Sequence, residues 1–371
     1  MEKKEVFSTS LIYFVVVCLF VTIRILNGFN LFSFMGEAES YVLSGVLQVG
    51  VLFLLSVVMF KTINKKTFRA TFEDFNYRKV SIKVILIAFG LGVVIYLLNV
   101  FVSSFFSAIL QSLGYHYGTS SGGEQNGWTL VLSLIFVALM PAVCEETLHR
   151  GMLLNGTRGL GMKKCILING LMFGLMHLNI EQFFYATLIG FFLGFVVYVT
   201  GSIYPCMIIH FMNNGIGVVL SFMQNKNLLS GGVFVKLNLL LSSNPILGTF
   251  IIFLIVFALV FLLYFLTRIL IRCSVEDDFR LRKKELSNLL KKFTYFGEVD
   301  KITNDSVEDD EELSNELSNL NRIKNLIDEH PEAVVIRTKK VKFDFKTKAF
   351  FWASASLMAL CTLFSFIWGV I

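Results

Sequence analysis

Long apolar runs separated by short polar segments dominate this chain of 371 residues. A helix needs about 20 apolar residues to cross about 30 Å of hydrocarbon. Nine runs approach or exceed that length, at roughly 8–26, 41–60, 82–112, 128–155, 163–178, 183–200, 203–223, 247–271 and 349–370. Because lipid offers no hydrogen bonds to the backbone, a spanning helix must satisfy its polar groups internally. The pattern predicts an all-α polytopic transmembrane helix bundle of about eight or nine spans.

One polar segment, 272–348, is much longer than the others and holds 17 of the chain's 27 acidic residues. Parts of it have apolar residues at helical spacing, and an acidic linker separates them. We therefore expect three parts: a transmembrane bundle at 1–271 with a core of chemical interest at about 125–220, a charged and partly helical cytoplasmic insertion at 272–348, and a C-terminal transmembrane helix at 349–371. The insertion is expected to be partly helical and partly disordered. The alternative is that it has a docking or regulatory role.

Composition narrows the function classes. Only 16% of residues are charged, against about 25% in soluble proteins. No basic stripe with interleaved aromatics suggests nucleic acid. The six cysteines show no CxxC spacing, so neither a zinc knuckle nor a disulfide framework is implied. The sequence contains no HExxH, GxSxG or Walker motif.

Lysine and arginine are distributed unequally between the connecting loops. The segments 61–80 and 156–164 carry several of them, whereas 27–40 and 113–127 carry none. The positive-inside rule then predicts a cytoplasmic N-terminus and, with nine spans, an outside C-terminus. The segment 224–246, with two lysines, is a mild exception. We expect an integral membrane protein, in a bacterial cell membrane, with the first apolar run uncleaved.

Three polar clusters interrupt separate apolar runs. They are Glu145 and Glu146 with Arg150, then His177, then His210 with Asn214. Such groups are costly in lipid and usually face a bundle interior or a water-filled cavity. Counting about 1.5 Å per residue from the cytoplasmic helix ends places all three clusters near mid-membrane. They predict one site, built from several helices and reachable from the cytoplasm.

Spacing within the first cluster suggests different roles for its two acids. Glu146 and Arg150 are four apart, so they share a helix face and can pair. Glu145, about 100° away, is left without that partner. A desolvated Glu that titrates near neutral pH is a competent general base. A structural ion-pair cluster is the alternative, and Pro141 can open this helix locally.

The histidine clusters also allow plain explanations. A lone buried His such as His177 is more often a hydrogen-bonded core residue than a catalyst. His210 and Asn214 share one helix face, which interhelical hydrogen bonding would also explain. Asn213 is expected to point elsewhere and to be spare, and His149 is treated as a bystander.

Order and spacing together resemble a known family. The motifs are EExxxR (Glu145, Glu146, Arg150), FxxxH (Phe173, His177) and HxxxN (His210, Asn214). In this order on successive spans they resemble the CPBP family of intramembrane proteases. That family includes the type II CAAX prenyl endopeptidases and bacteriocin-processing or immunity proteins. The resemblance covers roughly 125–220.

The resemblance implies catalytic roles for four residues. Glu145, with His177, would activate a water for attack on a peptide carbonyl. His210 and Asn214 would hydrogen-bond the developing oxyanion, usually the largest electrostatic contribution to acyl transfer.

The resemblance also bears on support and on cofactors. Glu146 and Arg150 are expected to hold the helix end as structural support. No cofactor is favoured, but zinc is possible, with Glu145, His177 and His210 as its ligands. Asn is a poor zinc ligand, which favours a metal-independent glutamate mechanism.

The sequence therefore predicts a peptidase that cleaves a peptide or protein at the membrane from the cytoplasmic side. The substrate would be a CAAX-type peptide or a leader or bacteriocin-type peptide, and the partners would be that substrate and the bilayer, without nucleic acid. A non-catalytic immunity or scaffold protein is one alternative. A transporter is another, because intramembrane Glu and His also form proton relays, although no inverted repeat is visible.

Overall fold

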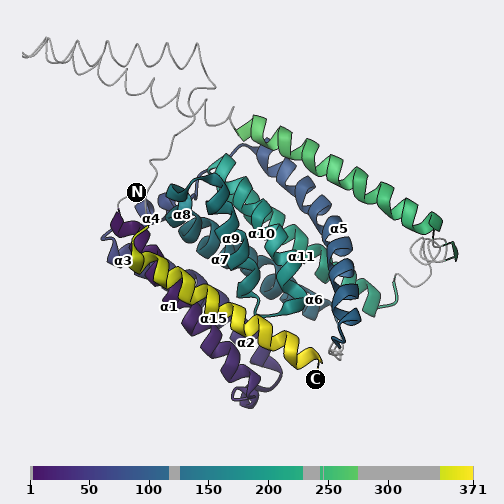
Figure 1. Cartoon of the computed structure of the whole chain (residues 1–371), viewed down its shortest axis with the longest axis horizontal. Helices are drawn as coiled ribbons and strands as arrows, with labels where there is room; N and C mark the ends of the chain where they lie inside the picture. Colours follow the sequence, from purple (N-terminus) through teal and green to yellow (C-terminus); the bar gives the residue numbers. More distant parts are fainter. Residues whose placement is uncertain (1–2, 117–125, 229–242, 245, 275–342, 371) are drawn as a thin grey trace, which may run out of the picture. The chain divides into compact units, whose positions relative to one another are not determined.

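The computed structural model describes residues 3–116, 126–228, 243–244, 246–274 and 343–370 (Figure 1). Within these ranges every regular element is helical. Eight helices are long and apolar enough to cross a membrane: Lys4–Gly28, Glu39–Ile63, Ile82–Ser112, Gly127–Leu160, Ile180–Thr200, Tyr204–Asn225, Ile246–Ser274 and Phe345–Val370. The prediction of an all-α polytopic bundle is confirmed.

Two of the long helices contain π-helical stretches. The second span consists of α2 (Glu39–Gly45), the π-helical η2 (Val46–Leu55) and α3 (Ser56–Ile63). The fourth consists of α6 (Gly127–Ser133), the π-helical η3 (Leu134–Leu139), α7 (Met140–Glu146), the π-helical η4 (Thr147–Leu153), α8 (Leu154–Thr157) and a 3₁₀ turn (Arg158–Leu160). Such π-helical turns are rare overall, but many of those that occur lie at functional sites.

The remaining labelled helices are continuous. They are α1 (Lys3–Gly28), α4 (Phe68–Asp74), α5 (Ile82–Ser112), α9 (Met162–Met176), α10 (Ile180–Thr200), α11 (Tyr204–Asn225) and α15 (Phe345–Val370), with a 3₁₀ segment at Ser33–Ala38.

The span expected at 163–178 is shorter than predicted. Helix α9 has 15 residues, which gives about 22 Å at 1.5 Å per residue. It ends because Leu178 adopts a positive φ of 53° and Asn179 caps the next helix, its side chain accepting from the Glu181 amide at 2.7 Å. It is not among the eight helices that are long enough to cross a membrane.

Helices α9 and α10 pack against each other more extensively than any other pair, and they lie side by side in Figure 1. Glycines allow this approach. A Cβ on Gly190 would lie 2.8 Å from the Cα of Gly170, and one on Gly174 would overlap Thr187. Small residues at such spacing let membrane helices come close. The contact fixes α9, which carries Phe173, against α10.

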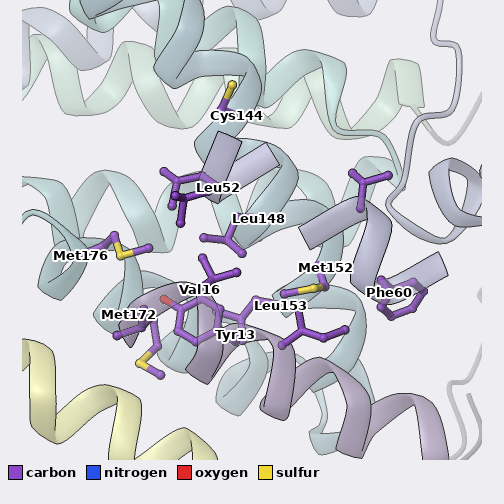
Figure 2. Packing of buried hydrophobic residues seen from close by; sticks show 14 of the residues in the cluster. Tyr13, Val16, Leu52, Phe60, Cys144, Leu148, Met152, Leu153, Met172 and Met176 are labelled. Carbon is purple, nitrogen blue, oxygen red and sulfur yellow. The ribbon is translucent and has the colours of Figure 1, made fainter. Parts of the chain in front are cut away.

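A buried apolar cluster packs around the C-terminal half of the fourth span (Figure 2). Leu148, Met152 and Leu153 of η4 meet Tyr13 and Val16 of α1 in this cluster. All seven residues of η4 are buried. The polar groups of this stretch therefore sit in a rigid, well-packed setting.

The described loops gather at two ends of the bundle. At one end, which we call the basic end, Ser202 donates to the Arg78 carbonyl at 2.6 Å and Arg158 lies over the Tyr198 ring. At the opposite end, the Tyr115 hydroxyl donates to Glu181 at 2.8 Å. The lysine-rich segments predicted to be cytoplasmic thus belong to one end. Which side of the membrane each end faces stays a prediction.

The chain divides into two compact units, Met1–Leu270 with Lys339–Ile371, and Ile271–Thr338. All but the first four residues of the second unit lie outside the described residues. The predicted partly helical insertion at 272–348 therefore falls almost entirely outside them and stays a prediction.

Candidate functional site

The paired acids lie at the end of α7, between the π-helical stretches η3 and η4. Glu146 and Arg150 are fully buried, and Arg150 Nη1 donates to Glu146 Oε1 at 2.9 Å. Arg150 Nη2 also donates to the Gly190 carbonyl of α10 at 3.2 Å. The ion pair expected from the i,i+4 spacing is therefore present. It ties the fourth span to α10.

Glu146 has a second partner that the sequence did not suggest. The Nδ1 atom of His210 lies 2.9 Å from the same Glu146 Oε1. Because a carboxylate only accepts, Nδ1 must carry the proton in this bond. The neutral ring then has an acceptor at Nε2, and the imidazolium has a donor there. The contact with Glu146 therefore fixes the orientation of the His210 ring.

Glu145 has a different environment. It is half-buried and lines a cavity of about 720 Å³, which His177, His210 and Asn214 also line. Its Oε1 accepts a hydrogen bond from Gln48 Nε2 of η2 at 2.8 Å. The structure thus brings all four residues of the expected catalytic set to one cavity.

His177 lies at the C-terminal end of α9 with a fixed ring orientation. Its Nδ1 lies 3.0 Å from the carbonyl oxygen of Phe173, so Nδ1 donates. The neutral ring then presents a lone pair at Nε2, which can accept from a water. Nε2 has no hydrogen-bond partner among the described residues.

The Phe173 ring connects the polar groups of three helices. The Arg150 guanidinium lies over it at 4.2 Å. The rings of His149, His177 and His210 meet it edge-on, with centroid distances of 5.2, 5.2 and 5.6 Å. A cation over an aromatic face is stabilising, more so away from water. The phenylalanine of the FxxxH motif thus spaces the ionisable side chains.

Asn214 is anchored on the fourth span at the Val137 carbonyl, to which Pro141 cannot donate. Its Nδ2 donates to the Val137 carbonyl at 3.1 Å. Proline has no N–H, so Pro141 cannot make the helical bond to that carbonyl, four residues earlier. An amide NH₂ has two donors, and one remains for a ligand.

The expectation that Asn213 is spare was wrong. Asn213 is buried, lines the same cavity and donates from Nδ2 to Asn214 Oδ1 at 3.0 Å. Its own Oδ1 faces Asn99 Nδ2 of α5 at 3.5 Å, and Ser103 lies 3.4 Å from Asn99. Residues 100° apart on one helix still meet here, because the side chains bend toward each other along a polar wall.

His149 contacts the backbone of Glu145 and not its carboxylate. Its Nδ1 lies 3.0 Å from the Glu145 carbonyl oxygen, and its Nε2 lies 3.2 Å from the Tyr13 hydroxyl. The ring is fully buried. These contacts fit the expected bystander.

Access from the cytoplasm predicts a cavity that opens toward the basic end. The residues that line the cavity do not lie at that end. Below Glu145, the buried side chains of Glu146 and Arg150 fill the bundle, and the Tyr77 hydroxyl closes on Thr147 at 2.6 Å. Burial raises the pKa of Tyr77 to about 12, so it stays a neutral donor.

The lining continues toward the opposite end instead. It includes Thr129 and Ser133 of α6, Gln182 of α10 and Ser221 of α11. Gln182 adjoins Glu181, which binds Tyr115 at that end. The lining thus runs from the middle of the bundle toward this end, and the side of the membrane from which a substrate enters stays a prediction.

The sequence allows a zinc site with Glu145, His177 and His210 as ligands. In the part of the chain that the structure describes, no three His, Cys, Asp or Glu side chains come together to hold a metal ion. The Nδ1 of His210 is also committed to Glu146. These donors do not form a closed coordination set, and no step below uses a metal.

Two residues of the site, Gln48 and Asn99, were missed by sequence reasoning. Both are amides within apolar runs, and polar groups inside spans often mark functional interiors. That signal was available, but neither residue belongs to a motif.

Comparison with protein families gives one match. Residues 127–216 match the family model described as Type II CAAX prenyl endopeptidase Rce1-like. The matched segment runs from α6 into α11 and contains all three motifs. Comparisons with curated proteins and with solved structures found no match.

Proposed function

We propose that this chain, whose residues 127–216 carry the Rce1-like segment of the CPBP intramembrane proteases, is a membrane endopeptidase with Glu145 as its general base. The family supports a CAAX-type peptidase at a coarse level. The observation that carries the mechanism is the cavity. Glu145 is its only acid among the described residues, with His177, His210 and Asn214 beside it.

The reaction follows from these positions. The Glu145 carboxylate takes a proton from a water that the Nε2 lone pair of His177 helps to orient. The resulting hydroxide attacks the peptide carbonyl. The second N–H of Asn214 stabilises the oxyanion, and so does His210 when its Nε2 carries a proton. Glu145 then returns its proton to the leaving amine, so that one water is added across the peptide bond and Glu145 is again a carboxylate.

The test compares Glu145→Gln with Glu181→Gln. Both remove one carboxylate from a membrane helix, but Glu181 lies outside the cavity. The probe is an internally quenched peptide with a farnesylated C-terminal CaaX sequence, and its unprenylated form is run in parallel. Loss of general base catalysis costs about 10²- to 10⁴-fold. We expect that loss for Glu145→Gln alone.

The non-catalytic immunity or scaffold alternative makes the opposite prediction. Wild-type protein would not cleave either peptide, and Glu145→Gln would keep the cellular phenotype while truncation removed it. The family description names prenyl endopeptidases, and nothing in it supports the bacteriocin-type substrate. A leader-type peptide is therefore a second probe, and its cleavage without the CaaX peptide would redefine the substrate.

A further inference from the structure

Gln48 is the one side chain among the described residues that binds the carboxylate of Glu145. It lies in the π-helical η2, on a span outside the matched segment 127–216. Its Nε2 donates to Glu145 Oε1 at 2.8 Å, so Oε2 is the oxygen left to take a proton. Gln48 and Glu145 both line the cavity.

Stability does not explain this residue. The Oε1 atom of Gln48 is buried and has no hydrogen-bond partner within the described residues. A buried acceptor without a partner destabilises the folded state. Neighbouring positions in the run VLQVGVLFLL are apolar, and an apolar side chain of similar size would avoid that cost.

We propose that Gln48 is a positioning residue for the general base. The inference rests on the proposed function of Glu145. The amide fixes one carboxylate oxygen, which sets the direction of the other toward the cavity. A misplacement of a reacting group by about 1 Å can cost about 100-fold in rate.

The first experiment separates activity from stability. Gln48→Met keeps the length of the side chain but removes both hydrogen-bonding groups. Its matched control is Ser56→Ala, on the same span, which also removes a buried group without a partner but lies outside the cavity. We expect both variants to melt at or above the wild-type temperature. Only Gln48→Met should lose kcat, by up to about 100-fold, with KM within about twofold.

The second experiment uses Gln48→Glu and reads the pH–rate profile. Two adjacent carboxylates cannot both be charged without cost, so the acid limb should move to higher pH. A merely structural residue would not move it. Unchanged kcat in Gln48→Met, a fall in its melting temperature that parallels the fall in kcat, or an unmoved acid limb would each overturn the inference.

The same preparations include wild type and Glu145→Gln. Wild-type protein without cleavage removes the proposed function, and this inference with it. Active wild type, inactive Glu145→Gln and fully active Gln48→Met would leave the proposed function standing and remove only the role of Gln48.

A second cavity carries an independent inference. A groove of about 840 Å³ runs between α9 and the start of α15. Its walls are apolar and include Leu171, Leu175 and Trp352. Lys164 and Lys348 line it near the first residues of both helices, are exposed, and form no ion pair within the described residues.

We infer that this groove binds an anionic phospholipid. Two unpaired ammonium groups complement a phosphate headgroup, and the apolar walls complement an acyl chain. Basic pockets between helices on the cytoplasmic side are known to favour anionic lipids.

Trp352 serves as the reporter, in a background where Trp128 and Trp368 are replaced by Phe. Its fluorescence is measured in vesicles that contain brominated phosphatidylglycerol or brominated phosphatidylcholine. The groove variant is Lys164→Ala with Lys348→Ala. The matched control is Lys163→Ala with Lys346→Ala, which removes the same charge from the same helices outside the groove.

In wild type and in the control, we expect brominated phosphatidylglycerol to quench Trp352 at least about twofold more than brominated phosphatidylcholine. In the groove variant both lipids should quench equally, since two lysine contacts are lost. Equal quenching by both lipids in wild type, or equal loss of preference in both double variants, would overturn the inference. The latter result would show surface attraction in place of a site.

Discussion

Replacing Pro141 by alanine tests how Asn214, the proposed oxyanion donor, is held. The new residue would supply an N–H to the Val137 carbonyl, which Asn214 Nδ2 now reaches at 3.1 Å. A helical bond would compete with the side chain for that oxygen. Asn214 would lose its anchor while the helix gained a regular turn.

The expected magnitude follows from one hydrogen bond. Such a bond contributes about 0.5–1.5 kcal/mol net, and each 1.36 kcal/mol is a tenfold change in rate. We therefore expect kcat/KM of Pro141→Ala to fall by about two- to tenfold. Proline costs up to about 3 kcal/mol in a helix interior, so the melting temperature should rise.

The assay is a double-mutant cycle on the quenched peptide. Asn214→Ala should lose activity, and Pro141→Ala should add little to it, because both act on one contact. Additive losses would place the effect of Pro141 elsewhere. Full activity in Pro141→Ala, or a lower melting temperature without loss of activity, would refute the link between the proline and the donor.

Three further predictions concern packing, pH and metal. Gly190→Ala should lower the melting temperature, because its Cβ would lie 2.8 Å from the Gly170 backbone. The expected cost in folding free energy is about 1–3 kcal/mol. Gly194→Ala is the control: the atom nearest to its Cβ lies at 3.7 Å, so the melting temperature should not change. Burial acts to lower the pKa of Lys66, but hydrogen bonds from its amine to Asp74 and a second carboxylate outweigh this and raise it. The stabilisation from charged Lys66 is thus present below the unfolded pKa and lost as pH rises through the folded pKa. The melting temperature of wild type should therefore fall above about pH 10, and that of Lys66→Met should fall less. Parallel curves of melting temperature against pH would contradict this. Cleavage should survive chelation and dialysis, and zinc-dependent recovery of a lost activity would contradict the metal-independent mechanism.

Hydropathy predicted the spans because lipid imposes a strong and simple constraint on backbone groups. It failed at α9 because turn chemistry, not hydropathy, ends that helix. Leu178 turns the chain with a positive φ, and Asn179 caps α10. Both features are local, yet neither alters the mean hydropathy of the run.

The site was predictable only where its contacts are local. Glu146 and Arg150 pair at four residues' separation, which helix geometry dictates. Glu146 and His210 are 64 residues apart, and Gln48 and Glu145 are 97 apart. No periodicity encodes those pairs, since they depend on how the π-helical stretches and glycine-lined contacts bring the spans together.

The two adjacent acids differ because the helix face of each meets a different neighbour. Glu146 meets Arg150 of its own span and His210 of α11, which both bind one of its oxygens. Its Oε2 is buried and has no hydrogen-bond partner within the described residues. Such a carboxylate cannot reach a substrate. Glu145 faces the cavity and is held by a single neutral amide, Gln48. Neighbouring carboxyl groups with opposed environments are how active sites divide acid–base work from electrostatic support. In the proposed mechanism Glu145 therefore carries the proton transfer, and Glu146 orients His210 through its Nδ1. In the pH–rate profile, Glu146→Gln should lower kcat by weakening the oxyanion donor while the limb that belongs to Glu145 stays in place, and a displaced limb with unchanged kcat would contradict this division.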